Sequence, residues 1–173
     1  MKNSIILFIV LISSFLFSQN NAQNPMELWV LPQEDNIIEN THKIASKNWN
    51  FDVKVLDGVF VKMMKDSIEA HNESLWKQLE NDGIANAKEK YQNAFEKEIE
   101  PLQQAVDISL SQGYVTGIYK KIQGQKREEK TEIQKVTSQE YRFMIYSYKR
   151  NKPEKLEARF IINIKDKTIR IFK

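Results

Sequence analysis

Residues 141–172 read YRFMIYSYKRNKPEKLEARFIINIKDKTIRIF, and their pattern establishes the fold class. Residues 141–149 are apolar on both faces, which predicts a central strand. In residues 156–164 apolar and polar side chains alternate, and residues 168–172 continue the pattern after a charged turn. Because the connections between these segments are short, consecutive strands must run antiparallel. The C-terminal part of the chain is therefore predicted to form an antiparallel β-meander.

Further strands are expected immediately before this meander. Residues 114–123 change to a two-residue period, which predicts a strand, and residues 130–137 form a weaker one. The charged segment 124–129 between them is expected to be a turn. The complete sheet would then have four to five strands.

The middle of the chain has helical periodicity. Residues 66–80 repeat apolar side chains on one face, as an amphipathic helix does, and residues 84–100 predict a second helix. Pro101 is expected to start or kink a third helical piece that ends near Gly113. The reason is that a proline inside a helix removes a hydrogen bond and clashes with the preceding turn.

The N-terminal part reads as a small βαβ-like unit. Residues 27–31 form a short apolar run that predicts a strand, residues 34–47 have near-helical spacing, and residues 49–56 alternate as a half-buried strand does. The sequence therefore predicts an α+β fold with this unit first, central helices next and the meander last. We expect residues 23–173 to form a single domain.

The first 22 residues have the pattern of a secretory signal peptide. Lys2 is their only charge, and the run from Ile5 to Phe17 is apolar apart from two serines. This run is shorter than the stretch of about 20 residues that spans a bilayer, although a permanent anchor is the alternative. We expect the segment to be removed, the protein to be periplasmic or secreted, and the mature chain to have no membrane span.

Composition excludes several classes of protein. Of the 173 residues, 41% are hydrophobic and 28% are charged, as in ordinary soluble domains. The chain has no cysteine, which excludes disulfides, thiol catalysis and zinc–cysteine sites. It contains neither a glycine-rich nucleotide motif nor a G-x-S-x-G motif. We therefore expect no cofactor.

The two parts of the expected mature chain differ in the sign of their charge. Residues 23–112 carry nine basic and sixteen acidic side chains, whereas residues 113–173 carry sixteen basic and seven acidic ones. Three interpretations are open: the parts neutralise each other, the basic part binds an anionic partner, or it binds nucleic acid. Export argues against nucleic acid, and no motif for its recognition is present.

Nine cations are candidate contributors to an anion-binding surface. Five surround the expected 124–129 turn and four surround the expected 151–154 turn, so they would form one patch if both connections point the same way. The candidates are Lys120, Lys121, Lys126, Arg127, Lys130, Lys149, Arg150, Lys152 and Lys155.

Signals for catalysis are weak in this sequence. His71 is expected to be a packed residue on its helix and His42 a surface residue, so neither predicts a metal site. Asp57 and Asp66 flank an apolar segment, which makes them the least ordinary of the acids. The roles of turn residue and helix N-cap nevertheless explain both.

The sequence thus favours an exported, non-catalytic binding or accessory protein of the bacterial envelope or the extracellular space. Its partner would be an acidic protein, an anionic glycan or a lipid head group. The alternatives are a small exported hydrolase that uses a carboxylate pair and an inhibitor or immunity-type protein. The oligomeric state stays open.

Overall fold

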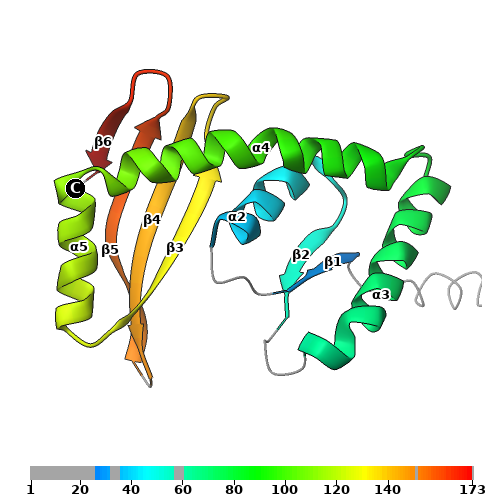
Figure 1. Ribbon diagram of the computed structural model, residues 1–173, viewed down its shortest axis with the longest axis horizontal. Coiled ribbons are helices and arrows are strands. Elements are labelled where there is room, and N and C mark those ends of the chain that lie inside the picture. The colour runs from blue at the N-terminus through cyan, green and yellow to red at the C-terminus, as the bar shows by residue number, and fades with distance from the viewer. Residues whose placement is uncertain (1–25, 32–35, 57–60, 151, 173) are drawn as a thin grey trace, which may run out of the picture.

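The computed structural model of the protein describes residues 26–31, 36–56, 61–150 and 152–172. These residues form a mixed α+β structure with helices in the middle of the chain and an antiparallel sheet in its C-terminal part (Figure 1). The predicted fold class is therefore confirmed. The predicted signal peptide and its cleavage site lie outside the described residues.

The described chain begins with a βαβ unit. Strands β1 (Glu27–Val30) and β2 (Asp52–Val55) pair in parallel. Helix α2 (Asn36–Ala45) and the 3-10 turn η1 (Ser46–Asn48) connect them. Parallel neighbours require such a crossover connection, so the unit expected from the sequence is present.

Two long helices follow the βαβ unit, and one of them differs from the prediction. Helix α3 (Val61–Asn81) covers the expected segment 66–80. Helix α4 (Ala87–Leu110) then runs without interruption through Pro101, so of the two expectations for this proline, a start or a kink, the start of a separate third helical piece is wrong.

The packing of α4 explains why the helix continues past Pro101. Its N-terminal half buries Ala87 and Tyr91 in one apolar core, and its C-terminal half buries Leu102 and Ala105 in another. An interior proline costs a helix about 3 kcal/mol. Burial on both sides of the proline offsets that cost, which no local sequence pattern reveals.

The predicted strand at 114–123 is also wrong, because residues Gly113–Gly124 form helix α5. β-branched and aromatic residues favoured a strand, but that preference depends strongly on context. The same residues have the spacing of one helical face over two turns. The side chains that α5 packs against the sheet are Val115, Ile118, Tyr119 and Ile122.

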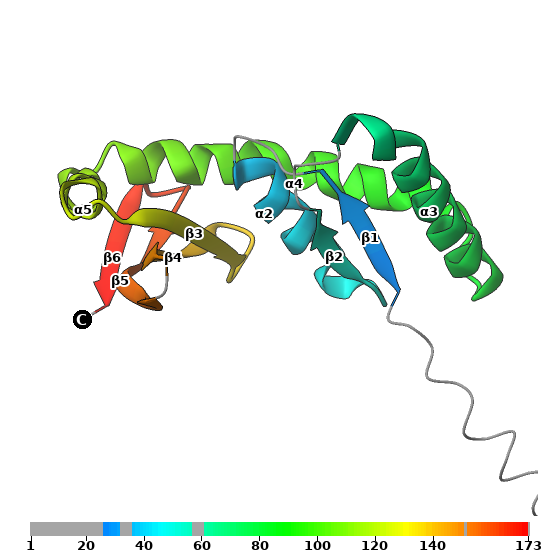
Figure 2. The same cartoon turned by 90° about the horizontal axis from the view of Figure 1, so that it is seen from below.

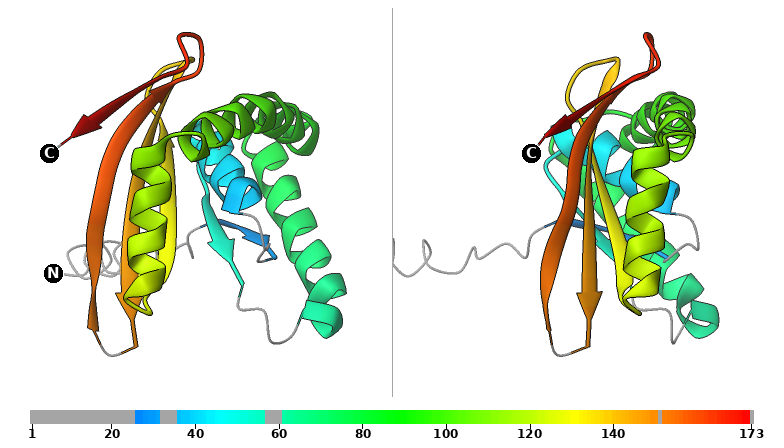
Figure 3. Two further views of the ribbon diagram at one scale, coloured as in Figure 1. Left: turned by 60° about the vertical axis from the view of Figure 1, so that its left-hand side comes forward. Right: turned by 90° about the vertical axis from the view of Figure 1, so that its left-hand side faces the viewer.

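Four strands form the C-terminal sheet in the order of the chain, and every neighbouring pair is antiparallel, as the meander predicts. Helices α4 and α5 lie on one face of this sheet (Figures 2 and 3). The prediction that residues 141–149 form a central strand is confirmed. The strands are β3 (Glu128–Lys135), β4 (Glu140–Lys149), β5 (Lys152–Asn163) and β6 (Thr168–Phe172).

A bulge in β5 changes which side chains face the helices. Ile145 pairs with Ala158. The next residue, Tyr146, pairs with Leu156, so Glu157 is the extra residue. Strict alternation along the strand predicts that Leu156 is buried and Glu157 exposed. Instead Leu156 is 46% exposed and the Glu157 side chain is 2% exposed.

Two apolar cores lie along α4, one under the sheet and one beside the βαβ unit. The sheet core includes Leu102 of α4, Val115 of α5 and Phe160 of β5. The other core includes Leu79 of α3 and Tyr91 of α4. Because α4 contributes to both, it fixes the sheet relative to the βαβ unit.

Candidate anion-binding site

The nine candidate cations lie on or beside the end of α5, the start of β3, the end of β4 and the start of β5, which meet at one end of the C-terminal sheet (Figure 1). The turn between α5 and β3 meets the β4–β5 connection there, because Glu128 pairs with Tyr148. The two connections thus point the same way, although the first joins a helix to a strand. We call this surface the basic end; it comprises Lys120, Lys121, Lys126, Arg127, Lys130, Lys149, Arg150, Lys152 and Lys155.

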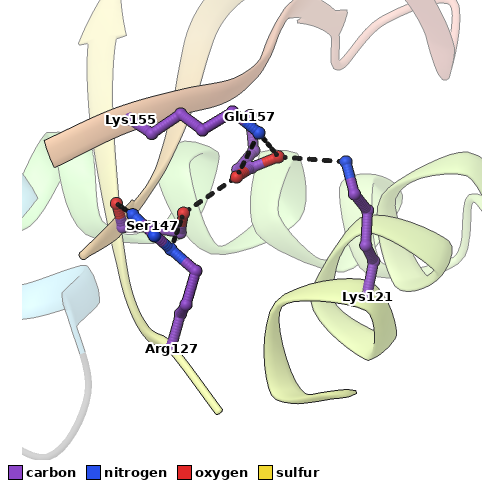
Figure 4. A network of polar contacts seen from close by, with 5 residues as sticks. All are labelled: Lys121, Arg127, Ser147, Lys155 and Glu157. Atoms are coloured by element: carbon purple, nitrogen blue, oxygen red, sulfur yellow. Dashed lines mark hydrogen bonds and ion pairs between the residues drawn. The ribbon is translucent and has the colours of Figure 1, made fainter. Parts of the chain in front are cut away.

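Glu157 lies at the centre of a polar network at the basic end (Figure 4). Its Oε1 accepts hydrogen bonds from Ser147 Oγ and Lys155 Nζ, both at 2.9 Å, and its Oε2 accepts one from Lys121 Nζ at 3.2 Å. Arg127 donates from Nε to Ser147 Oγ at 2.8 Å and from Nη2 to the Ser147 carbonyl at 2.9 Å. The network fastens α5 and the following turn to β4 and β5.

The surroundings of Glu157 keep its carboxylate ionised. Burial by itself would raise its pKa, but the hydrogen bonds from Lys155, Ser147 and Lys121 outweigh burial and lower the pKa to about 2. One negative charge is therefore shared between two lysines. Because Lys121 and Lys155 are bound to Glu157, they stabilise the fold and are less available to a partner than the sequence indicates.

The remaining cations of the basic end divide into two groups. Lys130 Nζ lies 2.7 Å from Glu132 Oε1 and 3.9 Å from Glu154 Oε1, so acidic neighbours compensate its charge. The others are exposed and lie outside the Glu157 network. They are Lys120, Lys126, Lys149, Arg150 and Lys152.

The β4–β5 connection places like charges opposite each other. Lys149 and Lys152 are cross-strand partners, and Arg150 is the residue next to Lys149. Like charges directly opposite each other destabilise a strand pair. A bound anion would relieve this repulsion, which makes the hairpin the part of the basic end best suited to a negatively charged partner.

The acidic part of the chain does little to neutralise the basic end. Among the described residues, the pair of Lys135 with Glu98 is the ion pair that joins residues 23–112 to residues 113–173. The other ion pairs lie within one part. Helix α3, which belongs to the acidic part, also lies on the opposite side of the molecule from α5 (Figures 1 and 2). The interpretation that the two parts neutralise each other is thus not supported by the contacts.

The two histidines have different environments. His71 stacks on Trp29 with ring centroids 3.8 Å apart, and its Nε2 lies 2.8 Å from the Glu27 carbonyl, so it is a packed residue as expected. His42 is half-buried and not the surface residue expected: its Nδ1 lies 2.8 Å from the Tyr91 hydroxyl, and burial lowers its pKa to about 4. Its helical spacing from the apolar Ile38, four residues earlier, was the signal for burial.

His42 belongs to an aromatic concavity that the sequence did not reveal. The concavity has a volume of about 490 Å³ and lies between β1, α2, α3 and α4. Burial also raises the pKa of Tyr91, so the hydroxyl and the imidazole both stay neutral at neutral pH. The aromatic residues that line the concavity are Trp29, His42, Trp76, Tyr91 and Phe95.

Five carboxylates of the helical part form ion pairs with lysine in the described structure, namely Glu27, Glu39, Glu69, Glu73 and Glu98. Glu27 pairs with Lys54 at 3.0 Å and Glu98 pairs with Lys135 at 2.5 Å. Of the two acids that the sequence singled out, Asp66 is exposed on α3 and Asp57 lies outside the described residues. Within the described ranges, no group of three or more His, Asp or Glu side chains is arranged to hold a metal ion.

None of the helices within the described ranges is long and apolar enough to cross a bilayer.

Comparisons with known proteins give no match: no family model fits the chain, and no curated protein or solved structure is significantly similar to it. The function is therefore inferred from the geometry described above.

Proposed function

We propose that the protein is an exported, non-catalytic binding or accessory protein whose basic end binds an anionic partner. The partner is an acidic protein, an anionic glycan or a lipid head group. The observation that carries this proposal is the pairing of Lys149 with Lys152 across the β4–β5 hairpin, next to Arg150. These three cations are exposed, and the acidic helices do not reach them.

The position of the hairpin supports the proposal. The Glu157 network holds the strands on both sides of the connection, so the three cations project from a fixed base. Because the strands that carry them are held, little backbone entropy is lost when these cations bind, which favours affinity. On the described residues, no observation favours the alternative of a hydrolase that uses a carboxylate pair.

The test compares two triple variants that change the net charge equally. The first carries Lys149→Glu, Arg150→Glu and Lys152→Glu at the basic end. The second carries three charge reversals at exposed lysines of α3 and α4: Lys77→Glu, Lys90→Glu and Lys97→Glu. Binding to a sulfated glycan, to vesicles with anionic lipid and to an acidic protein is measured in low and high salt.

We expect the wild type and the helix variant to bind one of these probes in a salt-sensitive manner, and the hairpin variant to lose that binding. Circular dichroism verifies that both variants are folded. Equal losses in the two variants would mean that net charge alone attracts the probe and would contradict the proposal. Absence of salt-sensitive binding to all three probes would contradict it as well.

A further inference from the structure

A groove of about 670 Å³ lies between α2 and the edge strand β3, away from the basic end. One wall consists of residues at the end of α2 and in η1, namely Lys43, Ile44 and Lys47. The other wall consists of residues 132–136, and Arg142 of β4 completes it. Figures 1 and 2 show α2 beside this edge of the sheet.

The side chain of Asn40 on α2 takes the place of a neighbouring strand along part of this edge. Its Oδ1 accepts a hydrogen bond from the Ile133 amide at 2.9 Å, and its Nδ2 donates one to the Thr131 carbonyl at 3.5 Å. Residues 131 and 133 therefore turn their backbone groups away from β4 and toward α2. Asn72 pairs in the same way with both backbone groups of Trp29 on β1.

The edge of β3 continues beyond Asn40 into the groove. Backbone groups alternate in direction along an antiparallel strand, so the N–H and C=O of Lys135 point the same way as those of Ile133. The Val136 amide confirms the alternation, since it donates in the other direction to the Glu140 carbonyl at 2.8 Å. An extended chain lying in the groove would meet the backbone of Lys135.

The charges that line the groove favour a ligand with carboxylates. Four cations line it, namely Lys43, Lys47, Lys135 and Arg142, against the one carboxylate of Glu132. That carboxylate already contacts Lys130. Lys43 pairs with Glu39 and Lys135 with Glu98, and these two acids are not part of the lining. Lys47 and Arg142 are thus the cations best placed to meet a ligand.

The groove also offers apolar contact. Val136 is 42% exposed at its rim, and Ile44 lies on the opposite wall. On an added strand, successive side chains point to opposite faces. A segment that alternates acidic with apolar residues would therefore match both the cations and the apolar side chains.

We propose that this groove binds an extended acidic segment of a partner protein, which adds to the edge of β3 and pairs with the backbone of Lys135. Strand addition supplies affinity through main-chain hydrogen bonds, and side-chain contacts supply specificity. The proposal is independent of the basic end, which lies at the opposite end of β3.

The test uses a fluorescent peptide with the sequence Glu-Val-Glu-Val-Glu-Val, capped at both ends. A second peptide has the same sequence with N-methyl groups on alternate residues, which keeps the charge and removes the backbone donors on one edge. Both possible N-methyl patterns are made, since only one edge would face β3. Fluorescence anisotropy measures binding to the full-length protein.

We expect the unmodified peptide to bind, and one N-methyl pattern to weaken binding by about tenfold through lost main-chain hydrogen bonds. The double variant Lys47→Glu, Arg142→Glu should lose binding by more than tenfold. The matched variant Lys77→Glu, Lys90→Glu, at exposed lysines of α3 and α4, should bind within about twofold of the wild type. In NMR spectra the Lys135 amide should shift on binding and exchange more slowly.

Two results would overturn the proposal. If both N-methyl patterns bind as well as the unmodified peptide, the groove does not add a strand. If the groove variant binds like the wild type while remaining folded, the peptide binds elsewhere. Loss of binding in Lys149→Glu, Lys152→Glu but not in the groove variant would place the peptide at the basic end and would equally refute the groove.

Discussion

Lys135 of β3 contacts both carboxylate oxygens of Glu98 on α4, at 2.5 and 2.6 Å. Their side chains are 26% and 18% exposed, so the pair is partly shielded from water. It links the positively charged sheet to the negatively charged helices at a point where α4 crosses the edge of the sheet. Other ion pairs of the described chain connect neighbours within one part.

Glu98→Gln is expected to lower the free energy of unfolding by about 1–2 kcal/mol, because Lys135 would lose its charged partner in a partly buried position. Urea denaturation monitored by circular dichroism measures the change. The control is Glu73→Gln, which breaks the exposed pair with Lys88 and should cost less than about 0.5 kcal/mol. Equal effects would show that the Glu98 pair has no special role.

Glu157→Gln is expected to destabilise the protein by about 2 kcal/mol at neutral pH, since charged hydrogen bonds with lysine are lost. The pKa of Glu157 is lowered to about 2. Its stabilising effect is therefore fully present above the ordinary pKa of about 4 and is lost as the pH falls toward 2. The denaturation curves of variant and wild type should differ at pH 7 and approach each other at pH 2.5. A constant difference between the curves would contradict this assignment.

His42 is expected to make stability depend on pH between about 6.5 and 4. Burial lowers its pKa to about 4, so the unfolded chain binds a proton in this range and the folded chain does not. Stability should therefore decrease as the pH falls from 7.5 to 5. In His42→Phe this decrease should be smaller, whereas Tyr91→Phe, which keeps the imidazole buried, should retain it. An unchanged slope in His42→Phe would contradict the prediction.

Pro101→Ala is expected to stabilise the protein by about 1–2 kcal/mol. The alanine restores a helical hydrogen bond inside α4, and part of the gain is offset by the greater freedom of the unfolded chain. Thermal denaturation should show a raised Tm. A lowered Tm would mean that the proline ring makes packing contacts that outweigh its cost to the helix.

Lys149→Glu is expected to raise stability by about 0.5 kcal/mol while weakening the binding of anions at the basic end. The substitution replaces a like-charge cross-strand pair with Lys152 by an opposite-charge pair. Lys120→Glu on α5 makes the same change of charge without this cross-strand relation and serves as the control. Urea denaturation measures stability, and binding is measured with the anionic probe that the wild type binds. If Lys149→Glu is less stable than the wild type, Lys149 and Lys152 do not destabilise the hairpin by repulsion.

Several features of the fold follow from local patterns in the sequence. The alternation in residues 156–164 and the apolar segment 141–149 predict strands because their side chains meet the core on known faces. The same logic fails at α5, whose β-branched and aromatic residues match a strand in type but a helix in spacing. It fails at Pro101, where distant core contacts on both sides keep α4 continuous.

The candidate site was predictable in its residue types and not in its arrangement. The excess of cations after residue 112 is visible in the sequence. Their division into structural and exposed cations is not, because it depends on the bulge that turns Glu157 toward Lys121 and Ser147. The groove beside β3 was equally hidden, since Asn40 and Lys135 are far apart in the chain.

The sequence by itself determined the α+β class, the order of the meander strands and the separation of acidic from basic residues, since these depend on periodicity and composition along the chain. Only the tertiary structure decided that α4 is continuous, that Glu157 is buried among cations, and that a basic groove opens beside β3. Each of these depends on contacts between residues distant in sequence. The free energy of these contacts is larger than the helix and strand propensities of the individual residues, which are all that a local sequence pattern reports.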